Sequence, residues 1–143
     1  MPDEIDFRLI RELQKDSRQK NTDIAEKLGL SEATVRRRVE NLINQGMVNF
    51  TIILNPEAAG FNVSAFMAFQ VQPQKIAEIA VKLAEINSFY SISVTTGSQD
   101  IVASAYFTSV HDIYRIVNDQ LKTIDGITKI ETSVIVERIK RAY

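Results

Sequence analysis

The pattern of apolar positions along the first 45 residues predicts three helices. Residues 3–15 carry a stripe at helical spacing, made of Ile5, Leu9, Ile10 and Leu13. Two further stripes follow, first Ile24, Ala25 and Leu28 and then Val35, Val39 and Leu42. Between them, Gly29 can take the left-handed conformation that ends a helix, and Ser31 is a favourable N-cap for the next one. The spacing predicts a helix-turn-helix.

The second helix of this pair carries three consecutive arginines. At 100° per residue its apolar stripe faces the core, which leaves Ala33, Thr34, Arg36 and Arg37 pointing outward. Arg38 flanks the stripe. This layout is that of a recognition helix that enters the major groove of DNA. The alternative is an ordinary helical hairpin in which the arginine run is a solvated face.

The segment after this helix is predicted to form a strand and then a connector. Gly46 ends the helix, and residues 47–54 (MVNFTIIL) are rich in β-branched and aromatic residues, which indicates a strand or wing. Residues 55–60 have the Asn-Pro start and the Gly end of a single helical turn. We therefore expect a winged helix-turn-helix DNA-binding domain, a connector and a second domain in residues 1–53, 54–61 and 62–143.

The second domain alternates between strand and helix patterns. Strands are expected at residues 63–71, 89–96, 101–107 and 127–136, and helices at 75–86 and 109–124. The order βαββαβ is the ferredoxin-like plan, in which two helices cover one face of a four-stranded antiparallel sheet. The fold class is α+β, with an N-terminal winged helix-turn-helix joined to this ferredoxin-like domain.

The other face of the sheet is expected to carry apolar side chains, namely Phe66, Ala68, Ile92 and Val94. An apolar sheet face left in water favours association with a second copy. We therefore expect face-to-face dimerisation.

Composition narrows the class of protein. The chain has 143 residues and no cysteine, which excludes disulfides and thiolate metal sites. It shows neither a signal peptide nor an apolar run near the roughly 20 residues that span a bilayer, so we expect a cytoplasmic protein without membrane contact. The net charge is −1, and residues 1–53 hold nine Lys/Arg and nine Asp/Glu. Any basic DNA-binding surface must therefore be local, at Arg18, Lys20, Lys27 and Arg36 to Arg38.

Several short motifs, in order along the chain, resemble those of one family. They are Asp6-x-x-Leu9-Ile10-x-x-Leu13-Gln14-x-Asp16-x-Arg18, then Leu30-Ser31-x-x-Thr34-Val35-x-x-Arg38-Val39-x-x-Leu42-x-x-x-Gly46-x-Val48, then Asn55-Pro56 to Gly60, and Thr96-Gly97-Ser98-Gln99-Asp100. This ordered set resembles the leucine-responsive/asparagine-synthetase regulator family (Lrp/AsnC) over nearly the whole chain. The resemblance implies a transcriptional regulator with an amino-acid-binding and oligomerisation domain. It also implies a homodimer that builds to higher assemblies such as octamers.

The resemblance implies where the effector binds. Its Gly-x-x-Asp turn corresponds to Gly97, Ser98, Gln99 and Asp100, with Gln99 where the family usually has an aromatic residue. Successive N–H groups in this turn could bind a carboxylate and Asp100 an ammonium group, although such a turn is by itself most often a plain hairpin. The resemblance also points to the hydroxyls of Thr132 and Ser133 on the last strand. We expect no cofactor, only a free amino acid as effector.

For DNA we assign Arg36 and Arg37 to base edges or adjacent phosphates, because arginine donates two hydrogen bonds to guanine. Ser31 and Thr34 are assigned to the DNA backbone near the helix N-terminus. For Arg38 a phosphate contact and an internal ion pair stay open. A two-fold dimer predicts a pseudo-palindromic operator in double-stranded DNA, with half-sites about 34 Å apart.

Two other functions stay open. One is an architectural DNA-binding protein without an effector. The other is a tetrapyrrole decarboxylase, because haem-pathway decarboxylases have a similar two-part architecture. The only histidine, His111, lies on the first turn of a predicted helix, where a solvated side chain is the simpler interpretation. The sequence contains no recognisable catalytic constellation or His/Cys metal cluster, so we expect neither catalysis nor a metal.

Overall fold

The chain divides into two compact units. A computed structural model describes residues 1–140; one unit is Met1–Ile53, called here the helical unit, and the other begins at Leu54 and is called the sheet unit. The last three residues of the predicted domain 62–143 lie outside the described residues.

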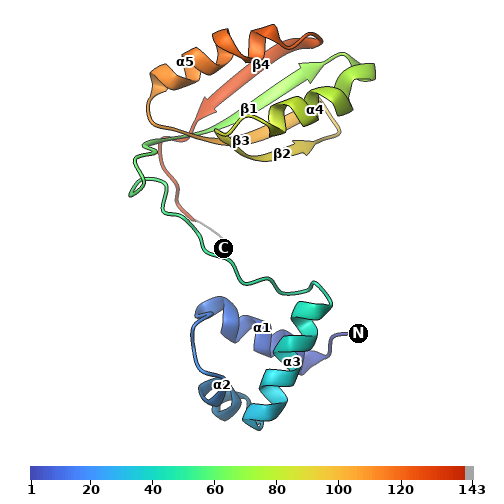
Figure 1. The fold of residues 1–143 in the computed structure, drawn as a ribbon, viewed down its shortest axis with the longest axis vertical. Coiled ribbons are helices and arrows are strands. Elements are labelled where there is room, and N and C mark those ends of the chain that lie inside the picture. The colour runs from blue at the N-terminus through green and yellow to red at the C-terminus, as the bar shows by residue number, and fades with distance from the viewer. Residues whose placement is uncertain (141–143) are drawn as a thin grey trace. The chain divides into compact units, whose positions relative to one another are not determined.

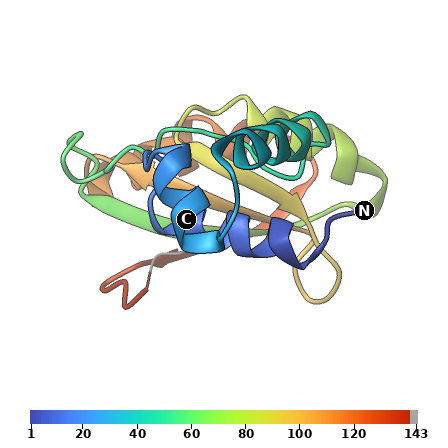
Figure 2. The same ribbon diagram turned by 90° about the horizontal axis from the view of Figure 1, so that it is seen from below.

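The helical unit contains three helices, α1 (Glu4–Lys15), α2 (Asn21–Leu28) and α3 (Glu32–Asn44), as predicted. They are the three blue to cyan rods of Figure 1, seen from a second side in Figure 2. The helices meet around one apolar cluster, formed by Leu9, Leu13, Ile24, Ala25, Val35 and Leu42. The periodicity of the sequence thus identified this core correctly.

Local hydrogen bonds set the helix ends. Asp3 caps α1 in a capping box with Asp6, in which each carboxylate accepts the other residue's backbone N–H. Gly29 ends α2 at φ +69°, a left-handed conformation that glycine adopts without steric cost. The hydroxyl of Ser31 caps α3 by accepting the N–H of Thr34 at 3.2 Å. The predicted turn chemistry is confirmed.

Of the strand or wing predicted at residues 47–54, the strand is wrong. These residues form no regular element and pair with no strand within the described part of the chain. Their apolar side chains are largely exposed, with Ile52 92% accessible. A strand needs a neighbouring strand to bond its backbone N–H and C=O groups, and β-branched composition alone does not supply one.

The sheet unit has the predicted order βαββαβ. Its strands are β1 (Val63–Val71), β2 (Phe89–Val94), β3 (Ile101–Phe107) and β4 (Ile127–Val134); its helices are α4 (Ile76–Ala84) and α5 (Val110–Asp119), with short 3-10 turns η1 (Pro73–Lys75) and η2 (Leu121–Thr123). All neighbouring strands are antiparallel, in the order β2-β3-β1-β4. Both helices lie on one side of the sheet (Figure 1).

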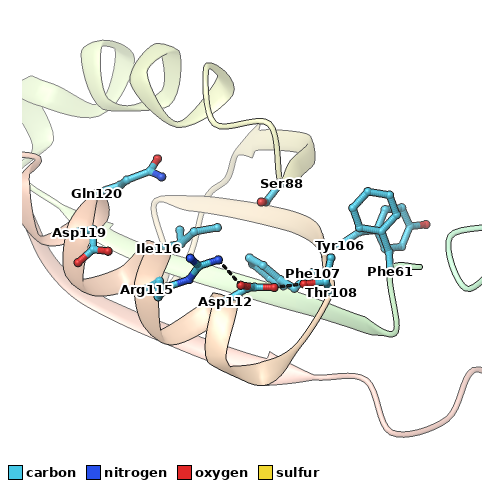
Figure 3. A pocket seen from close by; sticks show the side chains of 10 residues that line it. All are labelled: Phe61, Ser88, Tyr106, Phe107, Thr108, Asp112, Arg115, Ile116, Asp119 and Gln120. Atoms are coloured by element: carbon cyan, nitrogen blue, oxygen red, sulfur yellow. Dashed lines mark hydrogen bonds and ion pairs between the residues drawn. The ribbon is translucent and has the colours of Figure 1, made fainter. Parts of the chain in front are cut away.

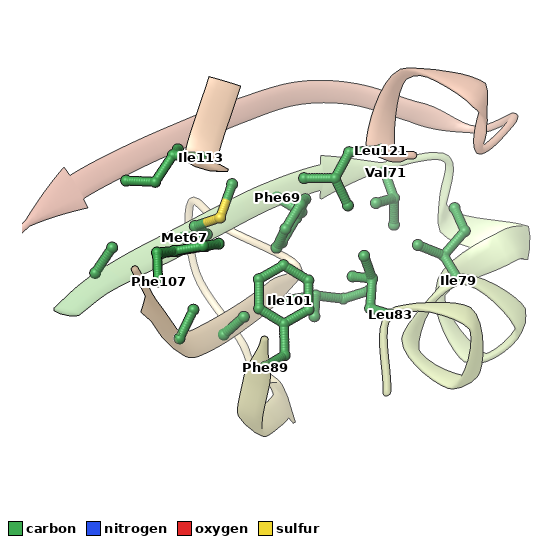
Figure 4. Packing of buried hydrophobic residues seen from close by; sticks show 13 residues of the cluster. Met67, Phe69, Val71, Ile79, Leu83, Phe89, Ile101, Phe107, Ile113 and Leu121 are labelled. Atoms are coloured by element: carbon green, nitrogen blue, oxygen red, sulfur yellow. The ribbon is translucent and has the colours of Figure 1, made fainter. Parts of the chain in front are cut away.

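The core of the sheet unit lies between the helices and the sheet (Figure 4). Along β1 every second residue is buried, namely Ala65, Met67, Phe69 and Val71. This alternation matches the strand pattern in the sequence, because successive side chains of a strand point to opposite faces.

Two side chains lie on the opposite face from the one predicted. Ile92 packs against the buried cluster, and Val94 pairs with the buried Ile101. A bulge between Phe89 and Ser91 adds a residue to β2 and so reverses its alternation. Phe66 and Ala68 do lie on the open face, since they pair with the open-face residues of β3 and β4.

The connector at residues 55–60 is a hydrogen-bonded turn. The Asn55 side chain accepts the N–H of Ala58 at 3.3 Å, and the N–H of Phe61 bonds to the carbonyl of Pro56 at 2.8 Å. Pro56 is fully buried. The predicted single turn is confirmed.

Candidate DNA-binding surface and effector site

The outward face of α3 is where the sequence placed it. Ala33, Arg36 and Arg37 are exposed, while Val35 and Leu42 are buried on the opposite side. The guanidinium groups of Arg36 and Arg37 form no ion pair or hydrogen bond with any other described residue. Two guanidinium groups without a partner in the described structure therefore face solvent on one helix.

The N-terminus of α3 carries two hydroxyls that contact each other. Ser31 Oγ and Thr34 Oγ1 lie 2.8 Å apart, and the same Ser31 oxygen caps the helix. These groups lie at the positive end of the helix dipole, which favours an anion such as a phosphate.

Arg38 is held inside the helical unit. Its NH1 group donates to Asp6 Oδ1 at 2.7 Å and to Asp3 Oδ2 at 2.9 Å. The two carboxylates raise the pKa of Arg38, with Asp6 the stronger contributor. The N–H of Asp6 lowers the pKa of the Asp3 carboxyl, and Arg38 lowers it further. Of the two roles left open for Arg38, the geometry matches the internal ion pair.

The turn at residues 97–100 is bonded to β1 through Asp100. The carboxylate of Asp100 accepts the N–H of Val71 at 2.8 Å through Oδ2, and its own N–H donates to the carbonyl of Phe69 at 2.9 Å. Thr95 closes the turn, because its N–H bonds to the carbonyl of Asp100 at 2.9 Å. One carboxylate oxygen of Asp100 thus has a structural partner and Oδ1 has none among residues 1–140.

The rest of the turn reaches the open face of the sheet. Gln70 donates to the carbonyl of Ser98 at 2.9 Å, and Gln99 donates to Glu131 at 3.2 Å. The side-chain oxygen of Gln99 is buried without a partner in the described structure. Gly97 adopts φ +117°, which disfavours any residue with a Cβ.

The two predicted hydroxyls on β4 lie on opposite faces. Thr132 pairs with the buried Met67, whereas Ser133 pairs with Phe66 on the open face. Neighbouring residues of a strand always point apart, so these two side chains do not line one site within this chain.

The sheet unit also contains a cavity of about 420 Å³ that holds none of the predicted site residues (Figure 3). It is lined by one face of α5, the end of β3 and the aromatic rings of Phe61 and Tyr106. In it the Asp112 carboxylate accepts hydrogen bonds from Thr108 and Arg115. The Thr108 hydroxyl, more than Arg115, lowers the pKa of Asp112 from 3.8 to about 2.

Comparison with known families identifies both halves. Residues 2–49 match the winged helix-turn-helix DNA-binding family, and residues 64–143, more than half of the chain, match the Lrp/AsnC ligand binding domain. The chain belongs to the Lrp/AsnC family. It is therefore a DNA-binding transcriptional regulator with a ligand-binding domain.

Two Lrp/AsnC relatives align with almost the whole chain. An uncharacterized HTH-type transcriptional regulator of Pyrococcus furiosus is 36% identical, covering 100% of this chain and 97% of the relative. The HTH-type transcriptional regulator LrpA of Pyrococcus horikoshii is 33% identical, covering 98% and 100%. Both relatives are transcriptional regulators, which supports the prediction that this chain is a regulator and not a decarboxylase.

Two solved structures share the fold of this chain. The complex of a Neisseria meningitidis transcriptional regulator with L-Met superposes with a TM-score of 0.92 at 24% identity, covering 99% of this chain and 94% of that one. AsnC of E. coli superposes with a TM-score of 0.92 at 21% identity, covering 99% of this chain and 96% of AsnC.

Three residues around the candidate Lrp/AsnC sites were missed from sequence. Gln70 and Glu131 bond to the turn from β1 and β4, and no local pattern distinguishes them from other polar strand residues. Asp3 precedes the first residue of α1, and its contact with Arg38 appears only when α1 meets α3.

Among residues 1–140, no three His, Cys, Asp or Glu side chains are arranged to hold a metal ion. In the same residues, no helix is both long and apolar enough to cross a membrane.

Proposed function

We propose that this regulator binds specific DNA sequences and that a free amino acid controls its DNA affinity or its assembly. The main support is the turn at residues 97–100. In the described structure, the N–H groups of Gly97, Ser98 and Gln99 donate to no protein group, although hydrogen bonds on both sides of them hold the turn in place. Successive unpaired N–H groups form a site for a carboxylate.

The charges of the turn suit both ends of an amino acid. Its carboxylate would bind the three N–H groups, and its ammonium would bind Asp100 through the oxygen that Val71 leaves unused. The Neisseria relative, which shares this fold, was solved as a complex with L-Met. Ser133 and Glu131 on the open face can contact the ligand's side chain, whereas Thr132 points to the other face in this chain.

The DNA half of the proposal rests on α3. Arg36 and Arg37 bind base edges or adjacent phosphates, and Ser31 and Thr34 bind the DNA backbone near the helix N-terminus. We propose Arg38 as an internal partner of α1 and not as a DNA contact, because its donating group already has two carboxylate partners.

A second copy of the chain is the proposed partner of the open sheet face. Phe66 and Tyr90 on this face are 51% and 53% exposed. Residues 47–54 add exposed apolar side chains and backbone groups without a strand partner, and a copy of the same segment can pair with them.

We propose a homodimer on a pseudo-palindromic operator, extending to assemblies such as an octamer, in the cytoplasm. The division into residues 1–53, 54–61 and 62–143 is part of this proposal.

A thermal-shift screen against the twenty amino acids, followed by calorimetry, tests the effector. A ligand at about 100 times its Kd stabilises the folded protein by roughly 2.7 kcal/mol. We expect one amino acid to bind wild type and not Asp100→Ala, whereas Asp119→Ala, an exposed aspartate of α5, keeps the response. Absence of binding at millimolar concentrations would favour the architectural alternative, and normal binding by Asp100→Ala would remove Asp100 from the site.

A further inference from the structure

The two carboxylates of the α1 capping box also contact Arg38 of the recognition helix, α3. Asp3 Oδ1 accepts the N–H of Asp6 at 2.9 Å, and Asp6 Oδ2 accepts the N–H of Asp3 at 3.0 Å. The second oxygen of each carboxylate accepts Arg38 NH1, at 2.9 Å from Asp3 and 2.7 Å from Asp6. All four carboxylate oxygens are therefore engaged, two within α1 and two with α3.

This contact lies directly beside the DNA-facing arginines. Arg38 follows Arg37 by one residue, so their side chains leave the helix 100° apart. A rotation of α3 about its axis would move both by the same angle. The Arg38 side chain is 23% exposed and that of Asp6 only 13%, so the ion pair between them is largely shielded from water, whereas Asp3 is 51% exposed and Arg37 faces solvent.

We propose that Asp3 and Asp6 are positioning residues for DNA recognition, which act through Arg38 to set the rotation of α3 and thereby the direction of Arg36 and Arg37. The proposal rests on the DNA-binding function of the family and is independent of any amino-acid effector.

Because Asp3 and Asp6 are negatively charged, the proposal predicts a change in DNA affinity opposite to the one that electrostatic repulsion predicts. Carboxylates close to a DNA-binding helix repel phosphates, so neutralising one should tighten DNA binding if electrostatics alone decide. If Asp6 instead holds α3 in its orientation, neutralising it should weaken binding to the specific sequence. The two explanations predict opposite changes for the same substitution.

The test compares Asp6→Asn with Glu4→Gln in the full-length protein. Glu4 is an exposed carboxylate in the same first turn of α1 and makes no ion pair with a described residue, so it is the matched control for charge. Binding is measured by fluorescence anisotropy on a duplex that wild-type protein selects from random DNA, and on a scrambled duplex of equal composition. Circular dichroism sets a temperature at which every variant is folded.

We expect Asp6→Asn to lower the ratio of specific to scrambled affinity by about tenfold, equivalent to roughly 1.4 kcal/mol, and Glu4→Gln to leave the ratio unchanged. If Asp6→Asn fails to fold, Asp3→Asn takes its place. Because Asp3 is half-exposed, its substitution lowers the unfolding free energy less. Binding by the Asp6 variant that is equal to or tighter than that of the Glu4 control would overturn the proposal.

Arg38→Gln separates positioning from direct phosphate contact. A lost phosphate contact reduces the slope of log affinity against log salt by about 0.9 and weakens both duplexes alike. We expect an unchanged slope and a loss of affinity for the specific duplex alone. The double variant Asp6→Asn/Arg38→Gln should bind like the weaker single variant, since both changes break one link. A reduced slope or additive losses would contradict the proposal.

Discussion

The outward face of α3 and the turn at residues 97–100 are both proposed binding surfaces, but they are built in different ways. On α3 the proposed DNA contacts Arg36 and Arg37 are consecutive residues whose guanidinium groups have no partner among residues 1–140. In the turn, Ser98, Gln99 and Asp100 each bond to a residue from β1 or β4 that is 28 to 32 positions away. One surface is a property of a helix and the other a property of a sheet.

The difference explains how each surface tolerates change. Substituting an outward residue of α3 leaves the core of the helical unit intact, because the buried positions lie on the opposite side. Substituting Asp100 removes a possible ligand contact and at the same time leaves the N–H of Val71 without its partner. Variants of the turn must therefore be chosen so that these two effects are separated.

Phe69→Ala should have the largest effect and acts on the sheet unit. Phe69 is fully buried, so we expect a loss of about 3–5 kcal/mol in unfolding free energy, measured by urea denaturation. Phe66→Ala in the same strand is the control. Its side chain is 51% exposed, and its loss should appear as weaker dimerisation in analytical ultracentrifugation. Equal losses of unfolding free energy would contradict the assigned faces of β1.

Arg37→Ala should weaken binding to the selected duplex by about 1–3 kcal/mol without changing the melting temperature. The reason is that its guanidinium group has no partner within the described structure whose loss would destabilise the fold. Arg11→Ala, an exposed arginine of α1, controls for total charge. Equal binding by the Arg37 variant and wild type would remove Arg37 from the DNA contacts.

Asp100→Asn and Asp100→Ala should separate ligand binding from the structure of the turn. The amide oxygen of Asn can still accept the N–H of Val71, whereas Ala leaves that group unpaired at a cost of roughly 1–3 kcal/mol. We expect both variants to lose the amino-acid response and only the Ala variant to lose stability, as measured by calorimetry. A normal response in Asp100→Asn would show that the charge of Asp100 does not bind the ligand.

Ser31→Ala should lower the unfolding free energy by about 1 kcal/mol, since the N–H of Thr34 loses its cap. Ser17→Ala, in the exposed turn before α2, should change it far less. Thermal denaturation of the two variants provides the comparison. A Ser31 variant as stable as the Ser17 variant would mean that the cap contributes little to the stability of the helical unit.

The smallest effect is a pH dependence from Asp112. Its pKa is lowered from 3.8 in the unfolded chain to about 2 in the fold, so its contribution to stability is present above pH 3.8 and is lost as the pH falls toward 2. We expect the melting temperature of wild type to fall more steeply than that of Asp112→Asn across this range. Parallel curves would contradict the lowered pKa.

The sequence predicted the elements better than their contacts. Helix ends at Gly29 and Ser31 and the alternation along β1 depend on neighbours a few residues apart, and all three are confirmed. The strand expected at residues 47–54 failed because a strand depends on a partner, which this segment does not find in the described chain. Ile92 and Val94 were placed on the wrong face because one bulge reverses a period-two pattern.

By itself, the sequence determined the three helices, the order βαββαβ and the outward direction of Arg36 and Arg37. These follow from local periodicity and from capping residues, which act within one turn or one strand. Only the tertiary structure decided that Arg38 binds Asp3 and Asp6 and that Asp100 bonds to Val71. Such contacts depend on how helices meet and on strand register, because they join residues about 30 positions apart whose spacing in the chain carries no local signal.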